Sequence, residues 1–193
     1  MKICVFGAAS NKIDDSYIAS VEKLGEKMAK RGHELVFGAG GHGLMGAAAR
    51  GVHAAGGKIT GVIPSFFRDE NIEAIFENCD ELVYTETMAQ RKAKMEDLAE
   101  AFIIVPGGIG TFEEFFEVLT LKQLGRHTKP IAILDINGYY KELEKFLDSS
   151  VEEKFIRDGC KHLYFYSTSS DEVLSYIEND EQKHVDVHEV KNG

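Results

Sequence analysis

The sequence predicts an α/β fold of the Rossmann-like, doubly wound type, with a mostly parallel sheet of about seven strands and helices on both faces. Short β-rich segments alternate with helical patterns along the chain, which is the order expected for right-handed β-α-β crossovers. Several of these segments are apolar at almost every position, as in strands that are covered on both faces. Three of them are followed by loops rich in glycine or small residues, namely Gly7–Ser10, Gly38–Gly46 and Pro106–Thr111.

The predicted strands share three properties: they are short, apolar and rich in β-branched or aromatic residues. Turn-forming or polar residues separate them from the helical segments. In chain order, the predicted strands are Ile3–Phe6, Leu35–Phe37, Ile59–Ile63, Leu82–Tyr84, Phe102–Val105, Ile131–Leu134 and Leu163–Phe165.

The segments between these strands have the length and periodicity of helices. Their apolar residues recur at three- and four-residue spacing, so each helix presents one apolar face to the sheet. The predicted helices are Asp15–Lys30, Leu44–Ala55, Met88–Glu100, Phe112–Leu124 and Tyr139–Phe155, with a last short helix at Asp171–Ile177.

A chain of 193 residues without an internal repeat favours one domain. We expect a single Rossmann-like domain at residues 1–178 and a polar C-terminal tail at residues 179–193. The segment Pro64–Asp80 has no clear periodicity and is predicted to be a mobile loop near a site.

The composition argues against several classes of partner. The formal net charge is −10 and no basic run is present, so nucleic acid is not an expected partner. No apolar run is long enough to cross a bilayer and the N-terminus has no signal-peptide core, so we expect a cytoplasmic protein without a membrane partner. Three widely separated cysteines without CxxC spacing suggest neither a disulfide framework nor a metal site.

The motif PGGIGTFEE, which follows the predicted strand FIIV, is the strongest functional signal. Gly107, Gly108 and Gly110 allow the backbone to fold around a ligand, and Thr111 is predicted to open a helix whose free amides favour an anion such as phosphate. Two glutamates lie in the first turn of this helix. They either complement the helix dipole or act catalytically, and the residues alone leave both interpretations open.

The segment TMAQRKAKM places two cations within an otherwise helical stripe. Met88, Arg91, Lys92 and Met95 follow i, i+3, i+4 and i+7 spacing and therefore share one helix face. The cations either extend past apolar neighbours to solvent or line a cleft, where the methionines would contact a flat base and the cations phosphate or carboxylate.

The loop GAGGHGLMG after the second strand resembles a dinucleotide loop only superficially. A dinucleotide fingerprint follows the first strand, and an acidic residue ends the second. Here the first loop is GAAS and the second strand ends at Phe37, which disfavours a dinucleotide site.

Together, GxGxxGLMG, the Arg-Lys pair followed by Met, and PGGxGTxxE resemble the LONELY GUY (LOG) family, formerly labelled lysine decarboxylase-like. The resemblance extends from about Ile3 to about Phe155. It implies a phosphoribohydrolase that needs no cofactor and cleaves cytokinin riboside 5′-monophosphate or AMP to free base and ribose 5-phosphate. It also implies a homodimer with its sites near the interface. The chain departs from the family pattern at Ala39, where glycine is usual, and at Ala89 and Leu121.

The resemblance also assigns residues. By position, the family's catalytic pair falls on Arg91 and Glu114. The family's nucleotide-contacting residues fall on Lys92, Gly108, Ile109, Gly110, Thr111, Phe112, Glu113 and Thr120. Met88 and Gly107 join them as predicted substrate-binding residues from the stripe and the glycine loop.

The mechanism that follows is hydrolysis of an N-glycosidic bond. We expect the 5′-phosphate to sit on the amides of Gly108–Thr111, while Glu114 stabilises an oxocarbenium-like ribose and orients water, and Arg91 holds the carboxylate. Three alternatives remain: a non-catalytic nucleotide-binding or carrier protein, a pyridoxal-phosphate decarboxylase and a structural protein. The predicted helix Phe112–Leu124 is apolar on more than one face, which either a second subunit or its own subunit would bury.

Overall fold

The computed structural model describes residues 1–69 and 74–181, whose central feature is a seven-stranded sheet. All six neighbouring strand pairs are parallel, so the predicted α/β fold is confirmed and the sheet is parallel throughout. The strands are β1 (Lys2–Phe6), β2 (Glu34–Phe37), β3 (Ile59–Pro64), β4 (Glu81–Thr85), β5 (Ala101–Ile104), β6 (Ile131–Leu134) and β7 (Phe165–Ser167).

The strand order is β4-β3-β2-β1-β5-β6-β7. The chain therefore builds outward from β1 to β4 and then crosses to the other side of β1 to add β5, β6 and β7. In sheets of this kind, the loops at the carboxyl ends of the two strands flanking the reversal diverge and leave a crevice for a ligand. These two strands are β1 and β5.

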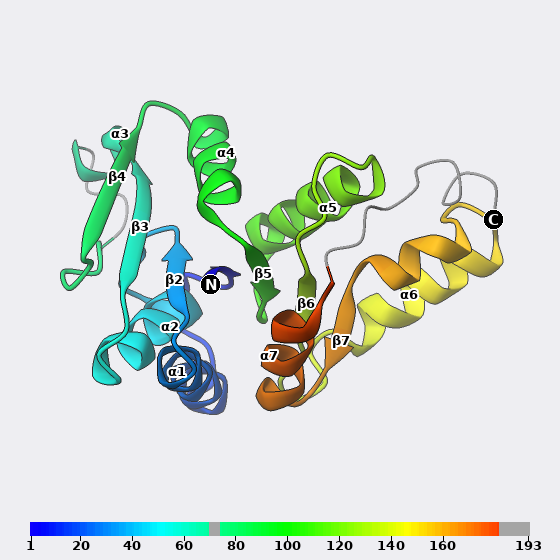
Figure 1. Cartoon of the computed structure of the whole chain (residues 1–193), viewed down its shortest axis with the longest axis horizontal. Helices are drawn as coiled ribbons and strands as arrows, with labels where there is room; N and C mark the ends of the chain where they lie inside the picture. Colours follow the sequence, from blue (N-terminus) through cyan, green and yellow to red (C-terminus); the bar gives the residue numbers. More distant parts are fainter. Residues whose placement is uncertain (70–73, 182–193) are drawn as a thin grey trace.

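Helices cover both faces of the sheet (Figure 1). The helices α1, α2 and α7 lie on one face, and α4 and α5 lie on the other. The helical elements are α1 (Asp15–Lys30), α2 (Gly43–Ala54), α3 (Ser65–Asp69), α4 (Met88–Leu98), α5 (Ile109–Gln123), α6 (Lys141–Glu152), the 3₁₀ helix η1 (Asp158–Leu163) and α7 (Ser170–Asn179). No helix among residues 1–69 and 74–181 is both long and apolar enough to cross a membrane.

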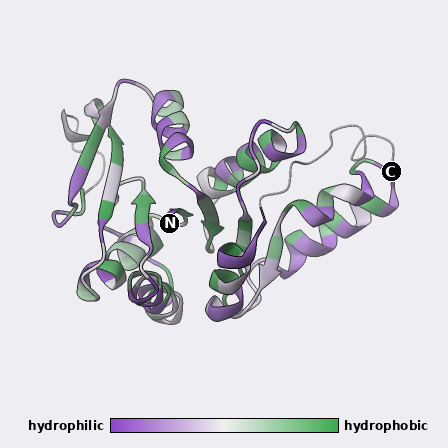
Figure 2. Cartoon of the chain, viewed as in Figure 1, coloured by the Kyte–Doolittle hydropathy of each residue, from purple (hydrophilic) through white to green (hydrophobic). Residues whose placement is uncertain are grey.

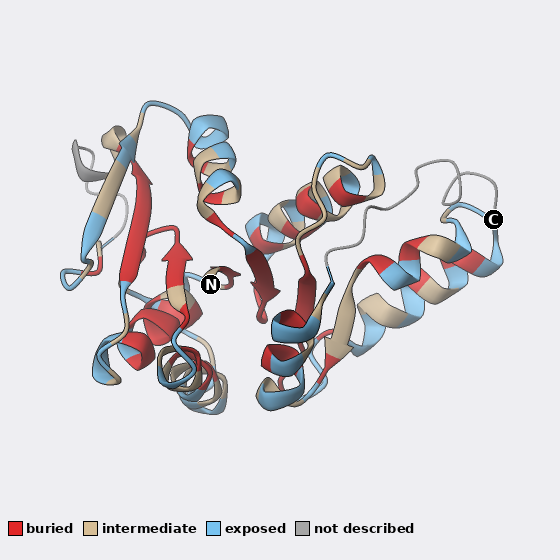
Figure 3. Cartoon of the chain, in the orientation of Figure 1, coloured by how far each residue is buried: buried red, intermediate tan, exposed pale blue. Residues whose placement is uncertain are grey.

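Alternation along the strands creates two hydrophobic cores. Ile3 and Val5 of β1 pack with α1, α2 and α7, whereas Cys4 and Phe6 pack with α4 and α5. The central strands are buried (Figure 3) and hydrophobic along most of their length (Figure 2). Burial on both faces explains why these segments are continuously apolar in sequence.

The structure differs from the sequence prediction at several boundaries. The last strand begins at Phe165 rather than Leu163, because Leu163 ends η1 with its side chain buried. The helix predicted to end at Phe155 ends at Glu152, and Lys154 just beyond it has a left-handed φ of 67°. The predicted polar tail lies outside the described residues from position 182 onward.

The predicted loop Pro64–Asp80 contains a short helix, α3, before residues 70–73, which lie outside the described part. Its second half lies along the loop that follows β2. The Gly41 amide donates to the Ala74 carbonyl at 2.7 Å, and the Phe76 amide donates to the Ala39 carbonyl at 2.9 Å. This segment therefore lies beside the ligand edge of the sheet.

Candidate functional site

A cavity of about 600 Å³ lies at the switch in strand order, which we call the switch-point cavity. Loops after β1 and β5, the first turns of α4 and α5, and one residue each of α2 and α3 form its walls. Its volume is within the range of ligand-binding pockets, roughly 300–1,000 Å³. The lining residues are Gly7, Ala8, Ala9, Ser10, Met45, Phe67, Met88, Ala89, Arg91, Lys92, Gly108, Gly110, Thr111, Glu113 and Glu114.

Arg91 reaches this cavity from α4 and is 6% exposed. Its Nε donates to the Val62 carbonyl at 3.1 Å, and its Nη2 donates to the Gly38 carbonyl at 3.2 Å. A side chain at position 38 would collide with the guanidinium, because a Cβ there would lie 1.6 Å from Nη2. Glycine after β2 therefore makes the space in which this cation is held rigidly by the backbone.

Glu114 faces Arg91 from α5. Its Oε1 lies 3.9 Å from Nη1 of Arg91, and the carboxylate side chain is 14% exposed. Burial raises the pKa of Glu114 to about 7, against the opposing effect of the Arg91 cation and with a further rise from the Glu113 charge. A carboxyl group with this pKa exchanges protons readily near neutral pH, as a general acid or base must.

Lys92 has different partners from Arg91. Its ammonium pairs with Glu113 and lies 2.7 Å from Glu117, one helical turn further along α5. Burial lowers the pKa of Lys92, but the hydrogen bonds and charges of these two carboxylates outweigh that effect and raise it overall. The ammonium is thus already neutralised, and a phosphate would have to compete with two carboxylates to bind it.

The glycine motif forms the floor of the switch-point cavity. Helix α5 begins at Ile109 rather than at Thr111 as predicted, with Gly108 as its N-cap. Because the N-cap is a glycine, no side chain caps the first turn. A Cβ on Gly107 would lie 2.1 Å from the Thr111 hydroxyl, whereas a Cβ on Gly108 or Gly110 would enter open space. The backbone is therefore accessible at the point where the helix amides favour an anion.

The predicted site residues do not all meet in this cavity. Met88, Arg91, Lys92, Gly108, Gly110, Thr111, Glu113 and Glu114 line it together. Ile109 is 89% exposed at the start of α5, and Gly107, in the loop before this helix, is buried. The Phe112 ring packs edge-on against Tyr140, with their centroids 6.0 Å apart.

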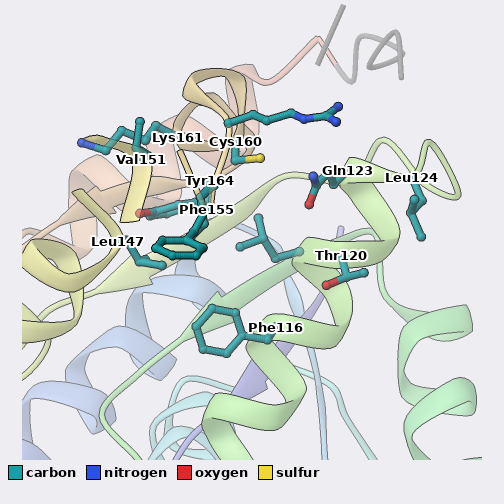
Figure 4. Close-up of a pocket in the computed structure, with 13 residues that line it drawn as sticks. Phe116, Thr120, Gln123, Leu124, Leu147, Val151, Phe155, Cys160, Lys161 and Tyr164 are labelled. Atoms are coloured by element: carbon teal, nitrogen blue, oxygen red, sulfur yellow. The ribbon is translucent and has the colours of Figure 1, made fainter. Parts of the chain in front are cut away.

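Thr120 lines a second cavity of about 320 Å³, between α5 and the α6–η1 segment (Figure 4). We call it the α5–α6 cavity. It is lined by Phe116, Leu119, Thr120, Gln123, Leu124, Leu147, Val151, Phe155, Ile156, Arg157, Cys160, Lys161 and Tyr164.

Sequence reasoning did not assign several cavity residues. Ala8, Ala9 and Ser10 come from the small-residue loop after β1, which marked the right edge of the sheet without indicating contact. Phe67 belongs to the aperiodic segment after β3, and Met45 belongs to α2. In the described part of the chain, no three His, Cys, Asp or Glu side chains are grouped so that they could hold a metal ion.

Comparison with known proteins places the chain in a family. The family model described as possible lysine decarboxylase matches residues 45–177. The cytokinin riboside 5′-monophosphate phosphoribohydrolase LOG2 of Arabidopsis thaliana is 37% identical over 185 residues, covering 96% of this chain and 86% of LOG2. This chain belongs to the LOG family. A probable LOG phosphoribohydrolase of Oryza sativa subsp. japonica, LOGL2, is also 37% identical and covers 95% of this chain and 74% of LOGL2.

Solved structures show the same fold at lower identity to this LOG protein. The molybdenum cofactor carrier protein of Chlamydomonas reinhardtii has a TM-score of 0.71 at 22% identity, covering 94% of this chain and 98% of that one. A molybdenum cofactor binding protein of Rippkaea orientalis has a TM-score of 0.69 at 19% identity, covering 92% of this chain and 94% of that one. These similarities concern the fold.

Ala39, one of the departures from the LOG pattern, has an unusual backbone conformation. Ala39, where glycine is usual in the family, has a φ of 62° and is fully buried. This is the left-handed region, in which a Cβ is unfavourable. The strained residue directly follows Gly38, whose carbonyl accepts from Arg91.

Proposed function

We propose that this LOG protein hydrolyses the N-glycosidic bond of a nucleoside 5′-monophosphate to give free base and ribose 5-phosphate. The substrate would be AMP, an N6-modified adenine riboside monophosphate of the cytokinin type, or both. The observation that carries the proposal is the buried pair of Arg91 and Glu114 beside the uncapped start of α5. The relatives named as phosphoribohydrolases support the same reaction.

The first part of the mechanism is anchoring. The 5′-phosphate would lie against the amides at Gly108–Thr111, where the helix dipole and the missing side chains favour an anion. Met45, Phe67 and Met88 provide apolar surface in the same cavity, and flexible methionines adapt well to a flat base. Binding energy at the phosphate would thus orient the reacting bond at a distance from it.

The second part is bond cleavage. As the bond from C1′ to the base nitrogen breaks, positive charge develops on the ribose, and the Glu114 carboxylate stabilises it. Glu114 accepts a proton from the attacking water, whose hydroxyl adds to C1′. The departing base takes a proton from solvent, and Glu114 afterwards returns its proton to solvent. A pKa of about 7 suits this task, because such a group accepts and releases protons at neutral pH. Arg91, fixed by the Val62 and Gly38 carbonyls, keeps the carboxylate in position.

The test is chromatographic detection of free base released from AMP and from N6-isopentenyl-AMP. Wild type should release base, and Glu114→Gln should lower the rate by about 10²- to 10⁴-fold, the usual contribution of a general acid–base group. Glu142→Gln is the control, because Glu142 is exposed on α6 and pairs with Lys145 outside the lining of the switch-point cavity. Near wild-type hydrolysis by folded Glu114→Gln would show the catalytic assignment to be wrong.

A non-catalytic nucleotide-binding or carrier function is the second candidate. A fold does not fix the chemistry that a protein performs, so binding without turnover is the alternative that the experiment must test. The buried Glu114 beside Arg91 argues for hydrolysis instead, because binding a phosphate requires neither the Glu114 carboxylate nor its raised pKa. Measurable binding of both nucleotides without release of either base would support the carrier.

We further propose a cytoplasmic homodimer that does not bind nucleic acid or membranes. Phe116, Leu124 and Phe155 line the α5–α6 cavity and are 37%, 47% and 87% exposed, which is unusual for large apolar side chains gathered in one place (Figure 4). A second copy that covers this surface would bury them. Thr120, which the family resemblance places at the nucleotide, lines the same surface.

A further inference from the structure

Two consecutive tyrosines hold the backbone that leads into the glycine loop. The Tyr140 hydroxyl donates to the Val105 carbonyl at 2.8 Å, and the Tyr139 hydroxyl donates to the Gly107 carbonyl at 2.5 Å. The two accepting carbonyls lie on either side of Pro106. The segment between β5 and α5 is therefore held at two points by the turn that follows β6.

This turn is built to present both rings. Asn137 and Gly138 have left-handed φ values of 57° and 75°, which reverse the chain directly before the tyrosines. Tyr140 is 1% exposed, and its amide donates to Asp135 Oδ1 at 2.9 Å. The Tyr139 ring rests edge-on against Tyr17 of α1, with their centroids 6.4 Å apart.

The Tyr140 ring also supports the far end of the loop. Phe112, in the first turn of α5, packs edge-on against this ring at a centroid distance of 6.0 Å. Tyr140 thus contacts Val105 before Pro106 and Phe112 after the glycines, while Tyr139 donates a hydrogen bond to Gly107 between them. Because Gly107 and Gly108 carry no side chains and have wide conformational freedom, a fixed loop needs support of this kind from outside.

We infer that Tyr139 and Tyr140 are positioning residues that fix the Gly107–Thr111 backbone for a 5′-phosphate. The inference rests on the proposed function for the identity of the ligand. Neither tyrosine lines the switch-point cavity, so both act through the loop. Without the Tyr139 hydroxyl, the Gly107 carbonyl is free to turn, and the amides that follow it lose their common direction.

The test compares Tyr139→Phe with wild type by calorimetric titration with ribose 5-phosphate and, separately, with adenine. We expect Tyr139→Phe to weaken ribose 5-phosphate binding about 3- to 10-fold, the effect of one hydrogen bond. The adenine affinity and the melting temperature should stay close to wild type, since the loop holds only the phosphate. In hydrolysis of AMP, the KM should rise more than kcat falls.

Tyr17→Phe is the matched control. Tyr17 and Tyr139 line the same pocket beside the loop, but of these two described residues only Tyr139 donates its hydroxyl hydrogen to the loop. Unchanged ribose 5-phosphate affinity in Tyr139→Phe would overturn the inference, as would an equal loss in Tyr17→Phe or an equal loss of adenine affinity. A wild type that does not bind ribose 5-phosphate would also overturn it.

These outcomes separate the inference from the proposed function. If wild type releases no base but its ribose 5-phosphate affinity depends on Tyr139, hydrolysis is wrong and the positioning role stands. If wild type hydrolyses AMP and Tyr139→Phe has unchanged ribose 5-phosphate affinity and KM, the positioning role is wrong and the hydrolase stands.

Discussion

The guanidinium Nη1 of Arg91 lies 3.9 Å from Oε1 of Glu114, and each side chain is mostly buried. This separation is too long for a direct hydrogen bond. The cation therefore acts on the carboxylate through its charge, while its other nitrogens are held by the Val62 and Gly38 carbonyls. The carboxylate keeps its lone pairs available for water, and its pKa reflects the balance between burial and this cation.

The free energy of unfolding should depend on pH through the ionisation of Glu114. Its pKa is about 7 in the folded chain against the ordinary 4.5 of a glutamate, so the folded state binds more protons between these values. The resulting stabilisation is complete below pH 4.5 and is lost as the pH rises through 7. Relative to Glu114→Gln, wild type should lose about 2 kcal/mol of unfolding free energy between pH 5.5 and pH 8, as measured by urea titration. Parallel pH dependence of the two proteins would contradict the raised pKa.

Arg91→Ala should move the pH dependence of hydrolysis. Loss of the neighbouring cation raises the pKa of Glu114 further, so the rise of kcat/KM with pH should shift to higher pH. At pH 7 the rate should fall by at least about 10-fold, since fewer molecules carry the carboxylate form. Lys94→Ala is the control, because Lys94 lies on the same helix and pairs with Asp97 at 3.8 Å, away from the cavity. An unshifted profile in Arg91→Ala would show that the cation does not tune Glu114.

Neighbouring positions after β2 should respond oppositely to the loss and gain of a methyl group. Ala39→Gly removes a Cβ from a residue with a φ of 62° and should raise the unfolding free energy by about 0.5–1 kcal/mol. Gly38→Ala places a Cβ 1.6 Å from Arg91 Nη2 and should lower it by about 1–3 kcal/mol. Urea denaturation gives both values, and destabilisation by Ala39→Gly would mean that the methyl group packs better than it strains.

Charge at the α5–α6 cavity should prevent dimerisation. Phe155→Asp and Leu124→Asp put carboxylates among side chains that a partner copy would bury, which costs several kcal/mol in an apolar interface. Sedimentation velocity at micromolar concentration should show a dimer for wild type and a monomer for either variant. Phe146→Asp serves as the control, because Phe146 on α6 is 64% exposed but does not line this cavity. A monomeric wild type would refute the proposed homodimer.

Much of this architecture could be predicted from the sequence, because strands buried on both faces leave a strong apolar signal. The segments FIIV and IAIL were predicted as strands that are buried on both faces, and the glycine-rich loop after FIIV marked the ligand edge. Tertiary packing sets the features that the sequence did not predict. Leu163 looks like the start of a strand but ends a 3₁₀ helix, and the short helix α3 in a segment without periodicity left no signal.

Part of the site could also be predicted from the sequence, because residue spacing shows which side chains share a helix face. The spacing of Arg91 and Lys92 placed both on one helix face, yet only the fold shows that one binds backbone carbonyls and the other two carboxylates. The raised pKa of Glu114 depends on burial by distant segments, which no local pattern reports. The support of the glycine loop by Tyr139 joins residues 32 positions apart, and nothing in either segment indicates it.

The helix α5 has a consequence of its own. Its 15 residues span about 22 Å, with the glycine loop and Glu114 at one end and Thr120, Gln123 and Leu124 at the other. A helix moves largely as a rigid unit, so a partner that displaces the C-terminal end of α5 also displaces Glu114 and the glycine loop. If subunits associate there, specific activity per subunit should vary with enzyme concentration, and dilution alone should alter turnover.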